Sequence, residues 1–120
     1  MADPQSKHIQ VVVTGSAGRL GREVMRTFDE AGFACKGVDS AATVEFRRDG
    51  DFVHRRADLT DYGEAIDALN GSDVVVHLAN ISCPGFQPDH KTFTQNVGMN
   101  YNVFSAASAL KCRRVIWLSS

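Results

Sequence analysis

The chain has 120 residues, of which 43% are hydrophobic and 22% charged, and its formal net charge is −1. This length fits one domain that can bury a core, and the near balance of 13 basic and 14 acidic residues does not imply a nucleic-acid partner. Residues 1–8 are polar and no apolar run approaches membrane-spanning length, so we predict neither a signal peptide nor a membrane anchor.

The first predicted strand, residues 9–14, is apolar along nearly its whole length, as is typical of a parallel strand covered on both faces. It runs into a glycine-punctuated turn, and a helical pattern begins directly after it. Gly15 permits the tight turn, Gly18 lets the backbone approach a pyrophosphate, and Gly21 lets the helix pack against the strand. The free N–H groups and the positive dipole end of the helix favour an anion here. We therefore predict that a dinucleotide phosphate binds over Gly15, Ser16, Ala17, Gly18, Arg19, Leu20 and Gly21.

The helix after this turn is predicted over about residues 20–31, and Gly32 supplies its stop. Its packing face is expected to hold Leu20, Val24, Phe28 and Ala31.

A second strand, residues 33–38, ends at Asp39, close to the distance at which an acidic residue binds the adenosine ribose in such folds. Its carboxylate can accept hydrogen bonds from both ribose hydroxyls of NAD but would repel the 2′-phosphate of NADP. NAD is therefore favoured over NADP. Two alternatives stay open: Asp39 is a solvated turn residue, or Arg47 and Arg48 neutralise a 2′-phosphate, although an exposed turn suits this arginine pair better.

Residues 52–57 predict a short third strand, and a helix follows to about Asn70. Asp61 is expected to cap this helix, with Glu64 completing a capping box. The helix should pack through Tyr62, Ala65, Ile66 and Leu69.

Residues 73–79 predict a fourth strand that is buried on both faces. His77 lies inside it with no carboxylate or nucleophile spaced to partner it, so a structural role is favoured over a catalytic one. The loop at residues 84–89 is rich in proline and glycine and is expected on the ligand side of the sheet.

A long helix is predicted over about residues 90–110, and residues 115–118 predict a fifth strand. The helix is expected to carry Phe93, Val97, Phe104 and Ala107 along one side. Alternating strands and helices predict an α/β fold, a Rossmann-type doubly wound parallel sheet of order 3-2-1-4-5 that ends after its fifth strand, with helices on both faces. Residues 1–120 would then form one dinucleotide-binding domain without a substrate region.

The pattern Thr-Gly-x-x-Gly-x-x-Gly that begins at Thr14 resembles the short-chain dehydrogenase/reductase superfamily, in its extended branch of nucleotide-sugar epimerases, dehydratases and sugar dehydrogenases. The segment that begins at His77 and the pattern of asparagines and paired alanines between Asn96 and Ala107 are similar to that branch as well. Met99 and Asn100 stand where the family usually has glycine and threonine.

This resemblance implies roles for several residues. Asp58 and Leu59 would line the adenine pocket, although the same segment is also explained as a helix start. Leu78, Ala79 and Asn80 would neighbour the cofactor, and Asn96 would order the site, with satisfaction of backbone groups as the alternative. Ser120 matches the catalytic serine at the end of the fifth strand. The sequence His-Leu-x-x-Ile-Ser is similar to uronate dehydrogenases, which implies that Ser82 contacts a sugar acid.

The resembled enzymes exchange a proton through a tyrosine whose pKa is lowered by a lysine four residues later. No Tyr-x-x-x-Lys occurs here, because Tyr62 is followed by Ile66 and Tyr101 by Ser105 at that spacing. We expect the chain to be the amino-terminal part of a longer NAD-dependent oxidoreductase or epimerase that acts on a sugar or sugar-derived substrate. The alternative is a non-catalytic dinucleotide-sensing or regulatory module. The resemblance allows a homodimer for the complete protein.

Cys35, Cys83 and Cys112 are odd in number and form no C-x-x-C pair, so neither a disulfide framework nor a zinc site is suggested. The four histidines show no ligand spacing. We expect a cytoplasmic protein without a bound metal.

Overall fold

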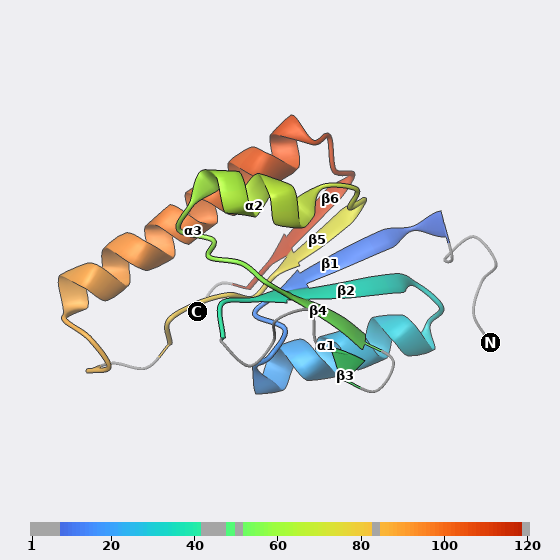
Figure 1. The fold of residues 1–120 in the computed structure, drawn as a ribbon, viewed down its shortest axis with the longest axis horizontal. Helices are drawn as coiled ribbons and strands as arrows, with labels where there is room; N and C mark the ends of the chain where they lie inside the picture. The colour runs from blue at the N-terminus through green and yellow to red at the C-terminus, as the bar shows by residue number, and fades with distance from the viewer. Residues whose placement is uncertain (1–7, 42–47, 50–51, 83–84, 119–120) are drawn as a thin grey trace.

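A computed structural model describes residues 8–41, 48–49, 52–82 and 85–118 of the chain. Strands and helices alternate along the sequence, except that β2, β3 and β4 follow one another without a helix between them, and the sheet has helices on both of its faces (Figure 1). The elements are β1 (Gln10–Thr14), α1 (Arg19–Glu30), β2 (Ala34–Asp39), β3 (Arg48–Asp49), β4 (Phe52–Arg56), α2 (Tyr62–Leu69), β5 (Val74–His77), α3 (Asp89–Ala109) and β6 (Arg114–Trp117).

The sheet has the order β3-β4-β2-β1-β5-β6. Its five longer strands are parallel, and their order β4-β2-β1-β5-β6 is the predicted 3-2-1-4-5. The prediction of a Rossmann-type sheet is therefore confirmed. The two-residue strand β3 was not predicted: it pairs antiparallel with β4 and contains Arg48, which the sequence placed in an exposed turn. Arg47 lies outside the described residues.

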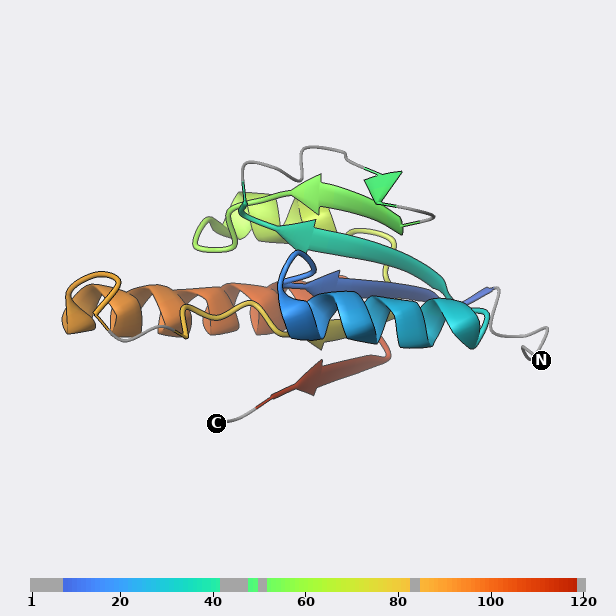
Figure 2. The ribbon, with the colours of Figure 1, turned by 90° about the horizontal axis from the view of Figure 1, so that it is seen from below.

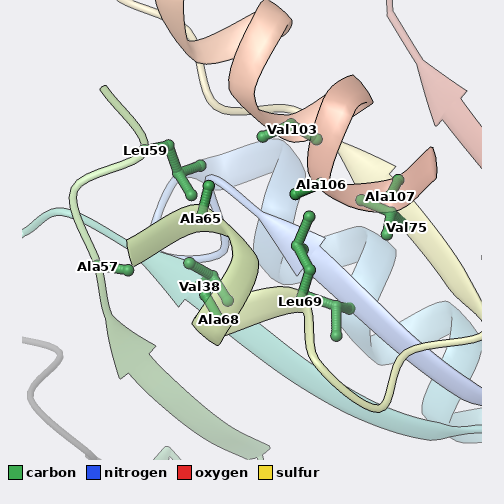
Figure 3. Close-up of a cluster of buried hydrophobic side chains, with 11 residues drawn as sticks. Val38, Ala57, Leu59, Ala65, Ala68, Leu69, Val75, Val103, Ala106 and Ala107 are labelled. Carbon is green, nitrogen blue, oxygen red and sulfur yellow. The ribbon is translucent and has the colours of Figure 1, made fainter. Parts of the chain in front are cut away.

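Two cores lie on opposite faces of the sheet, because the side chains of β1 alternate between them. Val11 and Val13 pack with Met25 of α1 on one face. Val12 packs on the other face, in a larger cluster formed with α2 and α3 (Figure 3). Seen from below, α1 lies in front of the sheet and α3 behind it, and the first part of α3 projects beyond the sheet (Figure 2).

The predicted packing face of the long helix is wrong for its bulky members. Phe93, Val97 and Phe104 are exposed by 70%, 50% and 37%, and only Ala107 of the four is buried. The buried face holds Asn102, Val103, Ala106 and Ala107 instead. Small side chains let α3 pack closely beside α2, which contributes the buried Ala65 and Ala68 to the same cluster.

The other two helices need smaller corrections. In α1, Val24 and Phe28 pack against the core as predicted, but Leu20 is 52% exposed, Ala31 is exposed, and the unpredicted Met25 is fully buried. In α2, Ala65 and Leu69 are buried and Ile66 is partly buried, whereas Tyr62 is 42% exposed.

Candidate functional site

The turn between β1 and α1 is packed so tightly that two of its glycines have no room for a side chain. Gly15 has a φ of +72°, and a Cβ there would lie 2.9 Å from the backbone N of Ala79. A Cβ on Gly21 would lie 2.2 Å from the carbonyl oxygen of Gly15. Gly21 therefore lets α1 pack against the turn itself, and not only against the strand as predicted from the sequence. Gly18 is less confined, since its Cβ would meet the Gly15 carbonyl oxygen at 3.4 Å.

The first turn of α1 presents unused hydrogen-bond donors. Its N-cap residue Gly18 makes no side-chain cap, and the first turn holds no acidic residue. By contrast, the N–H groups of Gly15 and Ser16 both donate to the carbonyl oxygen of Val38, at 2.8 and 3.2 Å. The N–H groups at the start of a helix have no intrahelical acceptor. The donors left for an anion are thus those of the first helical turn, beginning at Arg19.

A cleft of about 860 Å³ opens beside this turn at the carboxyl ends of the parallel strands. It brings together eleven of the predicted site residues: Gly15, Gly18, Arg19, Leu20, Asp39, Asp58, Leu59, Leu78, Ala79, Asn80 and Ser82. It is also lined by residues that the sequence did not assign to the site: Ser40, Arg56, Ala57, Thr60, Glu64, Ile81, Gln95, Met99 and Leu118. These follow the ends of the strands or face them from α2 and α3, and only the topology identifies them.

Four predicted site residues do not line this cleft: Ser16, Ala17, Gly21 and Asn96. The side chain of Ser16 is fully buried beneath the turn, where its Oγ lies 2.9 Å from Nδ1 of His54. Gly37 makes room for this pair, because a Cβ there would lie 2.5 Å from Ser16 Oγ. Ser16 and Gly21 therefore shape the turn from within. Ser120, the predicted catalytic residue, lies outside the described residues.

Asp39 joins the end of β2 to the turn. Its Oδ2 accepts a hydrogen bond from the N–H of Ala17 at 3.0 Å, and its Oδ1 accepts one from the N–H of Ala41 at 2.9 Å. A carboxylate offers about four acceptor positions on its two oxygens. Asp39 lines the cleft and keeps acceptor capacity there, which fits its predicted role towards a ribose.

The far end of the cleft is formed by the segment before α2. Asp58 Oδ1 accepts hydrogen bonds from the N–H and the hydroxyl of Thr60, at 3.0 and 2.6 Å. Asp61 caps α2 by accepting from the N–H of Glu64 at 3.0 Å, so the predicted N-cap is confirmed. The capping box is not formed, because Glu64 Oε1 accepts from the N–H of Asp58 instead. Glu64 thus fixes the backbone at the position predicted to face adenine.

The loop after β5 is held by Asn96 of α3. Its Oδ1 accepts from the N–H of Ile81 at 2.8 Å, and its Nδ2 donates to the carbonyl oxygen of Ile81 at 3.1 Å. Satisfaction of backbone groups was one of the two alternatives for this residue. Through these bonds Asn96 also orders the cleft-lining segment that continues to Ser82.

His77 is buried, with a side-chain partner at each ring nitrogen. Nδ1 lies 2.6 Å from Oγ1 of Thr14, and Nε2 lies 2.9 Å from Oδ1 of Asn100. Burial lowers the pKa of His77, an effect that the hydrogen bond to Asn100 opposes. Neither of these described partners is a carboxylate. The sequence left Asn100 without a role, and nothing in its spacing could have revealed this contact.

Comparison with known proteins decides which family uses this arrangement. The model of the NAD dependent epimerase/dehydratase family matches residues 11–120. The chain belongs to the NAD dependent epimerase/dehydratase family. This confirms the predicted resemblance, and NAD is the coenzyme of the family.

Two curated relatives and one solved enzyme illustrate the similarity. The chain is 30% identical over 112 residues to L-arabinose 1-dehydrogenase (NAD(P)(+)) of Haloferax volcanii, covering 92% of this chain and 41% of that protein. It is 27% identical over 128 residues to UDP-glucose 4-epimerase 3 of Oryza sativa subsp. japonica, covering 92% of this chain and 34% of that protein. Uronate dehydrogenase from Agrobacterium tumefaciens has a crystal structure that matches with a TM-score of 0.79 and 26% identity, covering 93% and 41% of the two chains. A mutant of that dehydrogenase was solved in complex with NAD.

The chain therefore spans between about one third and two fifths of the length of these three proteins. Among the described residues, no group of three or more His, Cys, Asp or Glu side chains could hold a metal ion. None of the helices in the described part of the chain is long and apolar enough to cross a membrane.

Proposed function

We propose that residues 1–120 form the NAD-binding part of a longer enzyme that transfers hydride to or from a sugar or sugar-derived substrate. The observation that carries the proposal is the uncapped first turn of α1, which begins beside a cleft large enough for a cofactor. Relatives that act on sugars, an arabinose dehydrogenase and a uronate dehydrogenase, support the substrate class.

In this proposal residues at the carboxyl ends of the strands would hold the coenzyme. The first N–H groups of α1, beginning at Arg19, would donate hydrogen bonds to its pyrophosphate. Asp39 would accept from the adenosine ribose, and Asp58 and Leu59 would hold the adenine ring. Ser82 would contact the substrate. When bound, the coenzyme supplies the hydride acceptor or donor, and the residues of this chain hold and orient it.

The chain has no Tyr-x-x-x-Lys pair, so we propose that the proton-transfer residues belong to a following segment. The match to the arabinose dehydrogenase, which covers only 41% of that protein, supports this. The coding sequence beyond Ser120 should therefore encode Tyr-x-x-x-Lys. A purified protein of that greater length should reduce NAD with a uronate or an aldose as substrate. Activity on nucleotide sugars alone would refute the sugar-acid assignment. A longer protein without that pair would favour a dinucleotide-sensing role instead.

Asp39 provides the test of coenzyme preference. The wild-type chain should bind NAD more tightly than NADP, because the 2′-phosphate would lie against a carboxylate. Asp39→Ala should weaken NAD binding and reduce the difference between the two coenzymes. Glu23→Ala is the matched control, since Glu23 forms an exposed ion pair with Arg26 on α1. An unchanged preference in Asp39→Ala would remove Asp39 from the selecting role.

A further inference from the structure

We propose that His77, as the neutral imidazole with its proton on Nε2, is a positioning residue that holds the floor of the coenzyme cleft. This inference rests on the proposed function, because the floor that His77 holds belongs to the same cleft.

The hydrogen bonds around Thr14 determine which nitrogen of His77 carries the proton. Thr14 Oγ1 lies 3.0 Å from the backbone N of Leu78 and 3.0 Å from that of Ala79, and it accepts from both. A hydroxyl has two acceptor positions and one proton. Both acceptor positions are used, so the hydroxyl proton is donated to Nδ1 of His77 at 2.6 Å. Nδ1 is therefore unprotonated.

The other nitrogen of the ring is fixed from α3. Nε2 of His77 lies 2.9 Å from Oδ1 of Asn100, which can only accept. Nε2 therefore carries the proton and donates it. A chain of hydrogen bonds thus runs from α3 through the imidazole to β1, and from Thr14 to the backbone after β5.

This series of hydrogen bonds ends at the surface that a coenzyme would touch. Leu78 and Ala79 line the cleft, and their backbone lies against the glycine turn. A Cβ on Gly15 would meet Ala79 N at 2.9 Å and the carbonyl carbon of Leu78 at 3.0 Å. Rotation of the Thr14 hydroxyl would take the acceptor from the Ala79 amide and let this segment move relative to the turn, whereas the Leu78 amide would keep the Thr14 carbonyl oxygen as an acceptor at 3.3 Å.

Protonation of His77 would oppose this arrangement. An imidazolium donates from both nitrogens, so its Nδ1–H would point at a Thr14 oxygen whose acceptor positions are already used. Among the residues that the structure describes, the side chains that form a hydrogen bond or a ring contact with His77 are Thr14 of β1 and Asn100 and Phe104 of α3, the Phe104 ring lying edge-to-face at 5.9 Å between centroids. None of these is charged or titratable. His77 is only 1% exposed, so water cannot solvate an imidazolium there.

The protonation state can be observed directly in the 120-residue chain by long-range ¹H–¹⁵N NMR of its histidine rings. We expect Nδ1 of His77 to resonate as an unprotonated nitrogen and Nε2 as a protonated one at pH 7. The reverse pattern, or signals averaged over both tautomers, would overturn the proposal. This measurement needs no coenzyme.

Two substitutions separate positioning from space filling. His77→Asn places an amide oxygen near the position of Nδ1 and keeps an acceptor for Thr14, whereas His77→Gln fills more of the space but reaches towards Asn100. We expect His77→Asn to bind NAD within about threefold of the wild type and His77→Gln to bind about tenfold more weakly. His90→Asn, at an exposed histidine on α3, is the matched control. If His77→Gln binds as well as His77→Asn, or better, the positioning role is wrong.

Amide hydrogen exchange at Ala79, whose N–H donates to the Thr14 hydroxyl, separates failure of this inference from failure of the proposed function. Exchange should be faster in His77→Gln than in His77→Asn, whether or not the chain binds a coenzyme. If the wild type binds no NAD, the proposed function fails and this exchange order alone decides the role of His77. Equal exchange in both variants, with the fold intact by circular dichroism, would contradict it.

Discussion

The two sides of β5 differ in how completely they are filled. Towards β1 and β2, Thr14, Ser16 and His77 are buried and hydrogen-bonded, and Gly15 and Gly21 of the turn have no space for an added methyl group. Towards β6, Ile116 and Trp117 are exposed by 40% and 48%. α1 packs on β1 and β2, whereas β6 lies at the edge of the sheet, away from it (Figure 2). The side of the sheet that contains β1, β2 and the glycine turn is therefore held by contacts among the described residues.

The outer side has the features of a surface that associates. Phe104 packs edge-to-face against Trp117 with ring centroids 5.8 Å apart, yet both rings remain partly exposed. An apolar edge strand offers a template for pairing with another chain. Substitutions should therefore affect folding and coenzyme binding on the inner side, and solubility on the outer side.

The largest expected effect is on the core between the sheet and α2. Leu69 is fully buried in that cluster, so Leu69→Ala should lower the free energy of unfolding by about 2–5 kcal/mol. Leu118→Ala is the matched control, because Leu118 is 55% exposed and should cost about 0.5 kcal/mol or less. Urea denaturation measures both. Equal losses would show that the two sides of β5 do not differ in packing.

The glycine turn should be next in size. In Gly21→Ala the new methyl group would lie 2.2 Å from the Gly15 carbonyl oxygen, so α1 must move away from the turn. We expect about 1–3 kcal/mol of destabilisation and a loss of NAD affinity of about tenfold or more. In the control Gly98→Ala the methyl group meets nothing within 4 Å, and the helix should gain about 0.5–1 kcal/mol. Undiminished NAD binding by Gly21→Ala would contradict the assigned role of the turn.

The sequence predicted this inner region well because the signals there are local. An apolar run, a glycine turn and a helix follow one another within about twenty residues, and burial on both faces makes β1 and β5 readable as strands. The predicted packing face of α3 is wrong because helical spacing favours the bulky Phe93 and Val97 as buried residues. The close contact with α2 instead uses small residues such as Ala106. The bonds of His77 join residues 63 and 23 positions away, a distance that no local spacing reveals.

A smaller effect is expected from pH. Burial in the folded chain lowers the pKa of His77 from its ordinary 6.5. Between pH 6.5 and this lower folded-state pKa, the unfolded chain therefore binds more protons than the folded chain. The contribution of His77 to the free energy of unfolding should therefore be fully present above about pH 6.5. It should be lost as the pH falls below that value and through the lower pKa of the folded chain. Urea midpoints at pH 7.5 and 5.5 should differ more in the wild type than in His77→Asn. Because the other histidines are present in both proteins, parallel losses would exclude His77 as the cause.

The smallest effect on folding is expected at the outer edge. Ile116→Lys should change the free energy of unfolding by about 0.5 kcal/mol or less but should reduce self-association of the chain, because an edge lysine opposes strand pairing. Sedimentation velocity at several concentrations measures this. His90→Lys adds the same charge at an exposed position outside the edge and serves as the control. Identical association in wild type and Ile116→Lys would place the contact elsewhere.

The central claim is that the first turn of α1 and the glycine turn bind the pyrophosphate of NAD. Titration of NAD into the ¹⁵N-labelled chain tests it directly through the backbone amide signals. The account predicts saturable shifts that are largest at Arg19, Leu20 and Gly21, with smaller changes at Leu78 and Ala79. Shifts confined to α3 and β6, or no saturable shift with NAD or NADP, would contradict it.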